Sequence, residues 1–186
     1  MLASPQERPL REDTVARLYQ RWRQALTARD GVAGAHCIHE LWMRGENGGT
    51  IDELLELLWK HATGAVPEWL PMRHFDWLPL AYEVAGRFAG RPRGRANIYL
   101  ILLDYTDSPQ GPFGVYVGMS RYTALQRFDQ HKAGIRHSGS VLKRGLEVIT
   151  GPVLHLQGLA RAHAGVVEKQ LAEALQVAGI KVKGGH

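Results

Sequence analysis

The longest uninterrupted apolar stretch of this chain, Ile98-Tyr99-Leu100-Ile101-Leu102-Leu103, is only six residues long and contains β-branched and aromatic side chains. A run of this length is typical of a buried strand and is far shorter than the ~18 apolar residues of a membrane span. A buried strand needs a sheet that other elements cover. With 186 residues the chain is long enough to build such a core, which excludes disorder as the default.

The elements expected around this strand are those of an α+β fold. Residues 113–118 form a second strand after a loop rich in Pro and Gly, and so short a connection favours an antiparallel pair. Ser120 or Thr123 caps a helix that ends at Gly134. A helical turn, a third strand, a long helix and an optional edge strand are expected at 138–144, 146–156, 159–178 and 180–183. This order predicts a small, mainly antiparallel three-stranded sheet flanked by helices.

The N-terminal half has a helical pattern instead. Its apolar residues recur at helical spacing. Three residues mark expected helix starts: Asp13 as an N-cap, Thr50 as the first residue of a capping box with Glu53, and Pro79 at a first helical position. The expected helices cover 13–29, 34–44, the stretch from Thr50 through Trp59, and 80–89.

Composition divides the chain at a stretch rich in arginine and glycine. All five tryptophans precede residue 90, whereas most of the net positive charge follows residue 95. We therefore expect a helical region over residues 1–90, a linker over 91–95 and a second domain over 96–186. The helical region is a candidate specificity or interaction domain, and a protein partner that binds its tryptophan-rich surface is one hypothesis for its use.

Positive charge gathers in one segment. The chain carries a net charge of +5, from 23 Lys and Arg against 18 Asp and Glu, and residues 121–144 account for the whole excess. A solvated helix face is the ordinary explanation of such a cluster, and a surface for nucleic acid is the alternative. On the second hypothesis the DNA-binding residues of this segment are Arg121, Lys132, Arg136, Lys143 and Arg144.

Several other classes of protein are excluded or disfavoured. Cys37 is the only cysteine, which excludes a disulfide scaffold and a thiolate cluster built from this chain alone. His36 and His39 lack a second ligand pair at zinc spacing, so we expect no metal site there. The first residues show no basic region followed by an apolar one, so no signal peptide is expected and the cytoplasm is the simplest location, with no membrane partner.

A few polar residues in the C-terminal half have the spacing of a reaction centre. Alternation along strands could bring Tyr99 and Tyr116 to a common side of the hairpin. Arg127 and His131, four residues apart, share a helix face and could converge on one phosphate. Glu168 lies on or beside the apolar stripe of the last long helix, where a carboxylate must be paired or bind a ligand.

The order of these residues resembles the GIY-YIG nuclease family. Asn97-Ile98-Tyr99 and Tyr116-Val117-Gly118 stand where that family has its two tripeptides, and three further residues follow in the family's order: Arg127, His131 and Glu168. The resemblance covers about half of the chain, residues 96–186. It implies a GIY-YIG-type endonuclease, a metal-dependent hydrolase that cuts phosphodiester bonds in double-stranded or branched DNA.

The resemblance also implies a role for each residue. Glu168 would bind Mg²⁺ or Mn²⁺, and Arg127 would hold the scissile phosphate. Tyr116 is the favoured general base, and Tyr99 would position the water or the phosphate. His131 could position the phosphate or accept the proton itself, because its reference pKa of about 6.5 suits that task better than a phenol at about 10. The sequence leaves the choice between Tyr116 and His131 open.

Three departures from the family's pattern bear on activity. Asn97 replaces the name-giving glycine, Met119 stands where many relatives have a polar residue, and no asparagine follows Asn97. His186 or the backbone amides of Gly184 and Gly185 are the candidates to replace that asparagine. These departures motivate a rival hypothesis, a catalytically inactive module that binds nucleic acid. No pattern indicates an oligomeric state.

Overall fold

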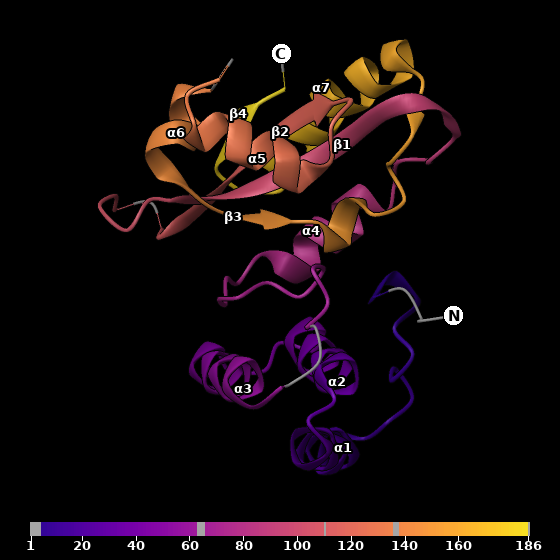
Figure 1. Cartoon of the computed structure of the whole chain (residues 1–186), viewed down its shortest axis with the longest axis vertical. Helices are drawn as coiled ribbons and strands as arrows, with labels where there is room; N and C mark the ends of the chain where they lie inside the picture. The colour runs from indigo at the N-terminus through magenta and orange to yellow at the C-terminus, as the bar shows by residue number, and fades with distance from the viewer. Residues whose placement is uncertain (1–4, 63–65, 110, 136–137, 186) are drawn as a thin grey trace. The chain divides into compact units, whose positions relative to one another are not determined.

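The structure is a computed structural model that describes residues 5–62, 66–109, 111–135 and 138–185. The chain divides into two compact units, which we call unit 1 (residues 1–79) and unit 2 (residues 80–186). Unit 1 is helical, and unit 2 combines a sheet with helices (Figure 1). No described helix is both long enough and apolar enough to span a bilayer.

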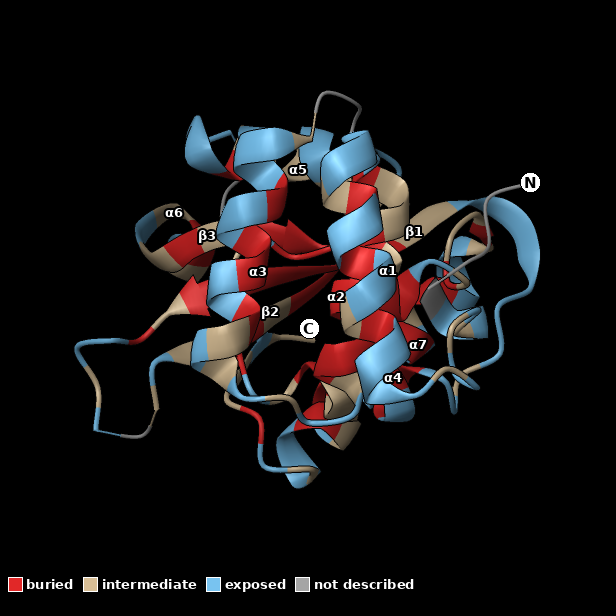
Figure 2. Cartoon of the chain, turned by 90° about the horizontal axis from the view of Figure 1, so that it is seen from below, coloured by how far each residue is buried: buried red, intermediate tan, exposed pale blue. Residues whose placement is uncertain are grey.

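Unit 1 is organised around its central helix. A short 3-10 helix, η1 (Pro5–Glu7), precedes α1 (Val15–Ala28), α2 (Gly31–Met43) and α3 (Gly48–His61). α2 packs against both α1 and α3 and is buried along most of its length. α1 and α3 show exposed faces interrupted by buried residues, the amphipathic pattern that the sequence predicted (Figure 2).

The helix starts of unit 1 differ from the expected ones. The N-cap of α1 is Thr14 rather than Asp13, and its hydroxyl accepts the Arg17 amide at 3.3 Å. The expected capping box at Thr50 is wrong: α3 begins at Gly48, because the Asn47 side chain accepts amides at the start of the helix, including that of Gly49 at 2.9 Å. Two glycines in the first turn concealed this start in the sequence.

A buried carboxylate ties the N-terminal segment to α2. Glu40 is 1% exposed, and its two oxygens accept hydrogen bonds from Arg8 at 2.9 and 2.7 Å and from Arg44 at 2.7 Å. Arg44 also donates to the carbonyl oxygens of Asp13 at 2.8 Å and of Arg11 at 2.8 Å. Each guanidinium group is therefore used inside the unit, which is how proteins accommodate a buried charge.

Unit 2 contains a four-stranded mixed sheet in the order β3-β1-β2-β4 (Figure 1). Its strands are β1 (Pro92–Asp104), β2 (Phe113–Ser120), β3 (Gly145–Ile149) and β4 (Val182–Gly184). β1 pairs antiparallel with β2 and β3, as expected, but β4 pairs parallel with β2. The α+β class is confirmed, whereas the three-stranded antiparallel sheet is wrong, because the optional edge strand forms and runs parallel.

The segment expected to be a linker, residues 91–95, lies mostly within β1. The Gly94 amide donates to the Gly158 carbonyl at 2.8 Å, and Pro92 and Ala96 both bridge to Leu159. The division between the units falls after residue 79, near the start of α4 (Leu78–Ala85). Arginine and glycine therefore mark a close approach of two backbone segments here and no hinge.

Helices cover both faces of the sheet. α5 (Ala124–Lys132) and α6 (Gly139–Arg144) pack over the face that carries Tyr99 and Ile101. A 3-10 helix, η2 (Gly151–Val153), occupies part of the stretch expected to continue the third strand. α7 (Arg161–Val177) packs against β1, β2 and β4.

The edge of β2 is only partly covered. β1 pairs with the whole length of β2, whereas β4 pairs with residues 115–117 alone. On the side of β2 that faces β4, therefore, no strand among the described residues pairs with residues 118–120. The candidate functional residues gather around this part of β2.

Candidate functional site

Tyr99 and Tyr116 lie on one face of the sheet with their ring centroids 6.1 Å apart. Tyr99 is fully buried and Tyr116 is half-buried. Gly118 faces Tyr99 across the strand pair, and a Cβ at that position would lie 2.5 Å from the Tyr99 hydroxyl and 2.8 Å from the Tyr116 ring. The glycine of the second tripeptide is therefore required for the two phenols to meet.

His131, at the end of α5, completes a group of three rings. Its centroid lies 6.2 Å from that of Tyr99 and 5.7 Å from that of Tyr116. The Ser138 amide donates to Nδ1 at 2.9 Å, so this nitrogen carries a lone pair. In the neutral ring the proton is then on Nε2, which lies 3.1 Å from the Tyr99 hydroxyl and donates to it.

This tautomer of His131 determines where the Tyr99 hydroxyl can donate its proton. Because the Tyr99 oxygen accepts from His131, the Tyr99 proton is available to Tyr116. Burial raises the pKa of both phenols, whereas the proximity of Tyr99 lowers the pKa of Tyr116 and that of Tyr116 raises the pKa of Tyr99. Of the two phenols, Tyr116 is therefore the one whose deprotonation is favoured by the other.

Arg127 supplies positive charge to the same place. α5 begins with a capping box between Thr123 and Gln126, which fixes the first turn that carries Arg127. The guanidinium group donates to the Gln130 side chain at 3.1 Å and to the Ile135 carbonyl at 3.3 Å. Its charge opposes the rise in the pKa of Tyr99, so it lies within electrostatic reach of that phenol.

Glu168 contributes a buried carboxylate from α7. It is 7% exposed and lies among the buried residues of the helix, including Ala164 and Leu171, as the helical spacing predicted. Its negative charge raises the pKa of Tyr116, which places the carboxylate within electrostatic reach of that phenol. The structure thus brings Tyr99, Tyr116 and His131 together and places Arg127 and Glu168 within electrostatic reach of the two phenols.

The donor set suits only certain metal ions. No group of three or more His, Cys, Asp or Glu side chains gathers within the described parts of the chain. An ion at Glu168 would therefore have fewer than three such side chains from the described residues, with water and substrate oxygens completing its shell. Mg²⁺ and Mn²⁺ accept such an arrangement, whereas a structural zinc site requires four protein ligands.

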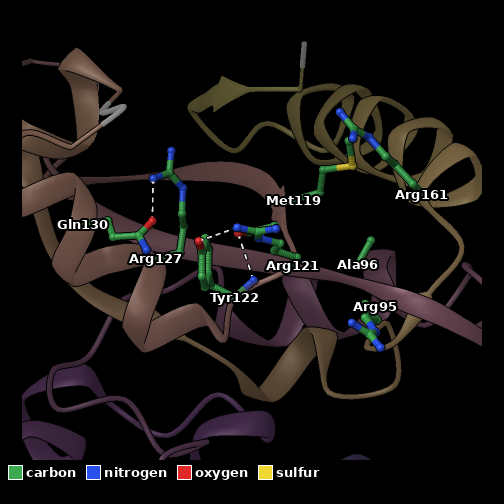
Figure 3. A pocket seen from close by; sticks show the side chains of 9 residues that line it. Arg95, Ala96, Met119, Arg121, Tyr122, Arg127, Gln130 and Arg161 are labelled. Atoms are coloured by element: carbon green, nitrogen blue, oxygen red, sulfur yellow. Dashed lines mark hydrogen bonds between the residues drawn. The ribbon is translucent and has the colours of Figure 1, made fainter.

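A pocket of about 630 Å³ adjoins this group and is lined by arginine (Figure 3). We call it the arginine pocket. Four guanidinium groups line it, from β1, the turn after β2, α5 and the start of α7, and none of its described lining residues is acidic. Those arginines are Arg95, Arg121, Arg127 and Arg161. Arg127 therefore belongs both to the pocket and to the group around the tyrosines.

The expected DNA-contacting cations fall into separate groups. Arg121 lines the arginine pocket, and Lys143 is exposed on α6. Lys132 donates to the Gly145 carbonyl at 3.1 Å, and Arg144 forms an ion pair with Asp107 at 2.8 Å. These two cations stabilise the fold, so we do not carry them into the proposed interface. Arg136 lies outside the described residues.

The structure gives roles to two of the departures from the family's pattern. The Asn97 side chain accepts the Gly158 amide at 3.0 Å and donates to the Tyr122 carbonyl at 3.1 Å, which joins three segments beside the pocket. Met119 lines the arginine pocket. His186 lies outside the described residues.

Two pocket arginines and one supporting side chain were missed as site residues. Arg95 belongs to the arginine-rich stretch expected to be a linker, and the pattern around Arg161 predicts only a helix. Arg161 begins α7, a helix with no acidic residue in its first turn and no side-chain cap. A basic residue at a helix N-terminus opposes the helix dipole and is the signal that could have found it. Gln130, which holds Arg127, shows no comparable pattern.

In unit 1 the histidines and tryptophans mostly build the core. The rings of His36 and His39 lie 4.9 and 5.5 Å from Trp69, and burial lowers the pKa of His39 to about 3. Trp22 and Trp42 are buried, whereas Trp59 is 42% exposed. A partner of unit 1 stays a prediction, and Trp59 is a side chain that such a partner could cover.

Comparisons with protein-family models, with curated proteins and with solved structures gave no match. We therefore infer function from the arrangement of the residues themselves.

Proposed function

We propose that unit 2 is a metal-dependent DNA endonuclease of the GIY-YIG type, a phosphodiester hydrolase that acts in the cytoplasm. The observation that carries the proposal is the convergence of Tyr99, Tyr116 and His131 with the charges of Arg127 and Glu168. These residues come from positions up to 69 apart in the chain and were chosen from the sequence for this chemistry.

The hydrogen-bond order supports Tyr116 as the general base. His131 holds its proton on Nε2 and gives that hydrogen bond to Tyr99, so its lone pair faces the Ser138 amide and not the phenols. The Tyr99 proton is then available to Tyr116 and would stabilise a phenolate there, in keeping with the lowering of the Tyr116 pKa by Tyr99. Tyr116 would then accept a proton from the attacking water, while Tyr99 and His131 orient it.

Charge neutralisation would come from two residues on different helices, Arg127 on α5 and Glu168 on α7. Arg127 would bind the scissile phosphate and stabilise the charge that develops on its oxygens. Glu168 would hold a divalent cation, which when bound supplies positive charge for the leaving oxygen and for the water. The same positive charge would lower the pKa of Tyr116, which burial and Glu168 hold above its ordinary value.

Plasmid nicking tests the proposal. We expect supercoiled DNA to be nicked in Mg²⁺ or Mn²⁺ and to stay intact in EDTA. Glu168→Ala should abolish nicking, whereas Glu173→Ala, which changes an exposed carboxylate on the same helix, should leave it unchanged. Full activity of the Glu168→Ala protein would remove the assignment.

A pH profile distinguishes the two candidate bases. Because burial raises the pKa of Tyr116, the cleavage rate should still be increasing with pH above neutrality. Tyr116→Phe should lower the rate by about 10²–10⁴-fold. His131→Gln keeps an amide donor toward Tyr99 and should lower the rate without flattening the profile. A profile that becomes flat in His131→Gln would make His131 the base.

An inactive nucleic-acid-binding module is the second candidate. The observation that favours it is the raised pKa of both phenols, which makes proton acceptance harder unless a cation is bound. It predicts salt-dependent DNA binding with no cleavage in any divalent metal. Nicking that depends on Tyr116 and Glu168 would exclude it.

A further inference from the structure

We infer that the arginine pocket is a second phosphate site, which holds a backbone phosphate of the nucleic-acid strand beside the scissile one. The inference deepens the proposed function and rests on it for the identity of the strand. It concerns Arg95, Arg121 and Arg161, which have no part in the chemistry assigned above.

Charge is the first argument. Four arginines line one cavity of about 630 Å³, and its described lining holds no acidic residue. Like charges gathered in this way repel one another, and an anion removes the repulsion. Other arginines of the described chain are paired with acids, as in Arg87 with Glu83 at 2.6 Å and Arg144 with Asp107 at 2.8 Å. The pocket arginines are arranged for an external anion.

The start of α7 is the second argument. Arg161 is the first residue of this 17-residue helix, whose N-cap, Ala160, offers no side-chain acceptor. The amides and dipole at a helix N-terminus attract anions and disfavour a cation. The positive charge of Arg161 is therefore unfavourable at this positive end of the helix dipole. A phosphate bound there would interact favourably with both the helix N-terminus and the arginine.

Local order is the third argument. Arg121 donates to the Tyr122 hydroxyl at 2.8 Å and lies over the Tyr122 ring, with Cζ 5.0 Å from its centroid (Figure 3). The Tyr122 carbonyl is in turn held by Asn97. Arg121 is therefore oriented before any ligand arrives, which lowers the entropic cost of binding. This also explains why asparagine is useful at position 97.

Continuity with the candidate reaction centre identifies the ligand. Arg127 lines the pocket and lies within electrostatic reach of Tyr99, so the two sites share a wall. A cavity of this volume exceeds the need of a single phosphate and lies within the usual range of ligand sites. A strand whose scissile phosphate meets Arg127 would extend its neighbouring phosphate into the pocket.

The salt dependence of binding tests this. A triple variant, Arg95→Gln with Arg121→Gln and Arg161→Gln, is compared with the wild type on a short duplex DNA in EDTA. The control removes the same charge from exposed residues of unit 1: Arg17→Gln, Arg23→Gln and Lys60→Gln. Each lost phosphate contact should reduce the slope of log K against log[salt] by about 0.9, so the pocket variant should lose about 1–3 in slope and the control almost none.

Equal losses in the two triple variants, or an unchanged slope in the pocket variant, would overturn the inference. Circular dichroism shows whether each variant is folded, and the three single variants replace any triple variant that is not. A second readout places the phosphate: a neutral methylphosphonate next to the cleavage position should weaken wild-type binding and have little effect on the pocket variant. The same loss in both proteins would contradict the placement.

The two proposals can fail separately. Metal-dependent nicking with an unchanged slope in the pocket variant would leave the nuclease in place and remove the second site. A reduced slope without nicking in any divalent metal would remove the nuclease and retain a pocket that binds backbone phosphate.

Discussion

In unit 1, Arg8 and Arg44 direct their guanidinium groups onto the carboxylate of Glu40, whereas in unit 2 four arginines line a pocket whose described walls hold no acid. The same side chain thus serves two purposes. In unit 1 it satisfies a charge that the fold has buried, and the cluster is complete without a ligand. In unit 2 the described charges leave an excess that an anion can satisfy.

The buried polar residues follow the same division. His39 is buried against Trp69 in unit 1, and its lowered pKa reflects mainly the loss of water around it. His131 is equally buried in unit 2, but hydrogen bonds orient both of its nitrogens toward neighbours, and one of those neighbours is a phenol. Burial of a histidine alone therefore indicates little; its connection to other ionisable groups indicates a site.

Removing Glu40 should have the largest effect. Glu40→Gln leaves two arginines without their buried partner and should lower the free energy of unfolding by about 3–5 kcal/mol. Because all five tryptophans lie in unit 1, tryptophan fluorescence during urea unfolding reports this unit. Glu53→Gln, at an exposed site in the same unit, should change little. A small change in the free energy of unfolding of Glu40→Gln would show that Arg8 and Arg44 do not stabilise unit 1 through Glu40, against the contrast with the pocket arginines.

Acid should weaken unit 1 through His39. Its pKa is about 3 in the folded state against 6.5 ordinarily, so between these values the unfolded chain binds the extra proton. Stability is therefore lost as the pH falls from about 6.5 to about 3, by up to about 4 kcal/mol. The fluorescence-detected urea midpoint measures it. His39→Leu should flatten the dependence and the exposed His61→Leu should not; equal slopes in both would contradict it.

Gly118→Ala should destabilise unit 2 by displacing the side chains of Tyr99 and Tyr116. The added methyl group would contact the Tyr99 hydroxyl and the Tyr116 ring, at a cost of about 1–3 kcal/mol. Nicking should decrease with it. Gly139→Ala is the matched control, because a Cβ there meets no neighbour within 4 Å. Thermal unfolding followed by circular dichroism gives the stability, and equal behaviour of the two variants would show that Gly118 leaves ample space.

The smallest expected effect is that of Arg161→Gln, which separates a role in DNA binding from a role in stability. Arg161→Gln removes a cation from the N-terminus of α7 and should stabilise unit 2 by about 0.3–1 kcal/mol at low salt, while it weakens DNA binding. Arg161→Lys keeps the charge and should leave the stability unchanged. A loss of both stability and binding in Arg161→Gln would show that Arg161 serves the fold, as Arg44 does.

Local patterns predicted the site better than the fold's details. Strand alternation and the four-residue spacing of Arg127 and His131 depend on backbone geometry alone, so they predict which of these side chains share a face. The predicted start of α3 was wrong because Asn47, the actual N-cap, precedes two glycines, which lower the helix propensity of the first turn.

The arginine pocket could not be predicted from the sequence because its walls come from segments far apart in the chain. Arg95 and Arg161 are 66 positions apart, and they approach one another because β1 pairs with the loop before α7, as the bridges of Pro92 and Ala96 to Leu159 show. Composition indicated an excess of positive charge over residues 121–144. Of that segment, Arg121 and Arg127 line the pocket, whereas the fold uses Lys132 and Arg144 internally.

The hydrogen bonds of His131 have a consequence for magnetic resonance. The imidazole is 1% exposed and its Nε2–H is bonded to Tyr99, so that proton should exchange slowly with water. Slowly exchanging imidazole protons resonate downfield of most backbone amides, where a single signal can be followed without assigning the whole spectrum. The protein thereby contains its own reporter, whose frequency should change whenever a metal ion or a phosphate alters the charge around the two phenols.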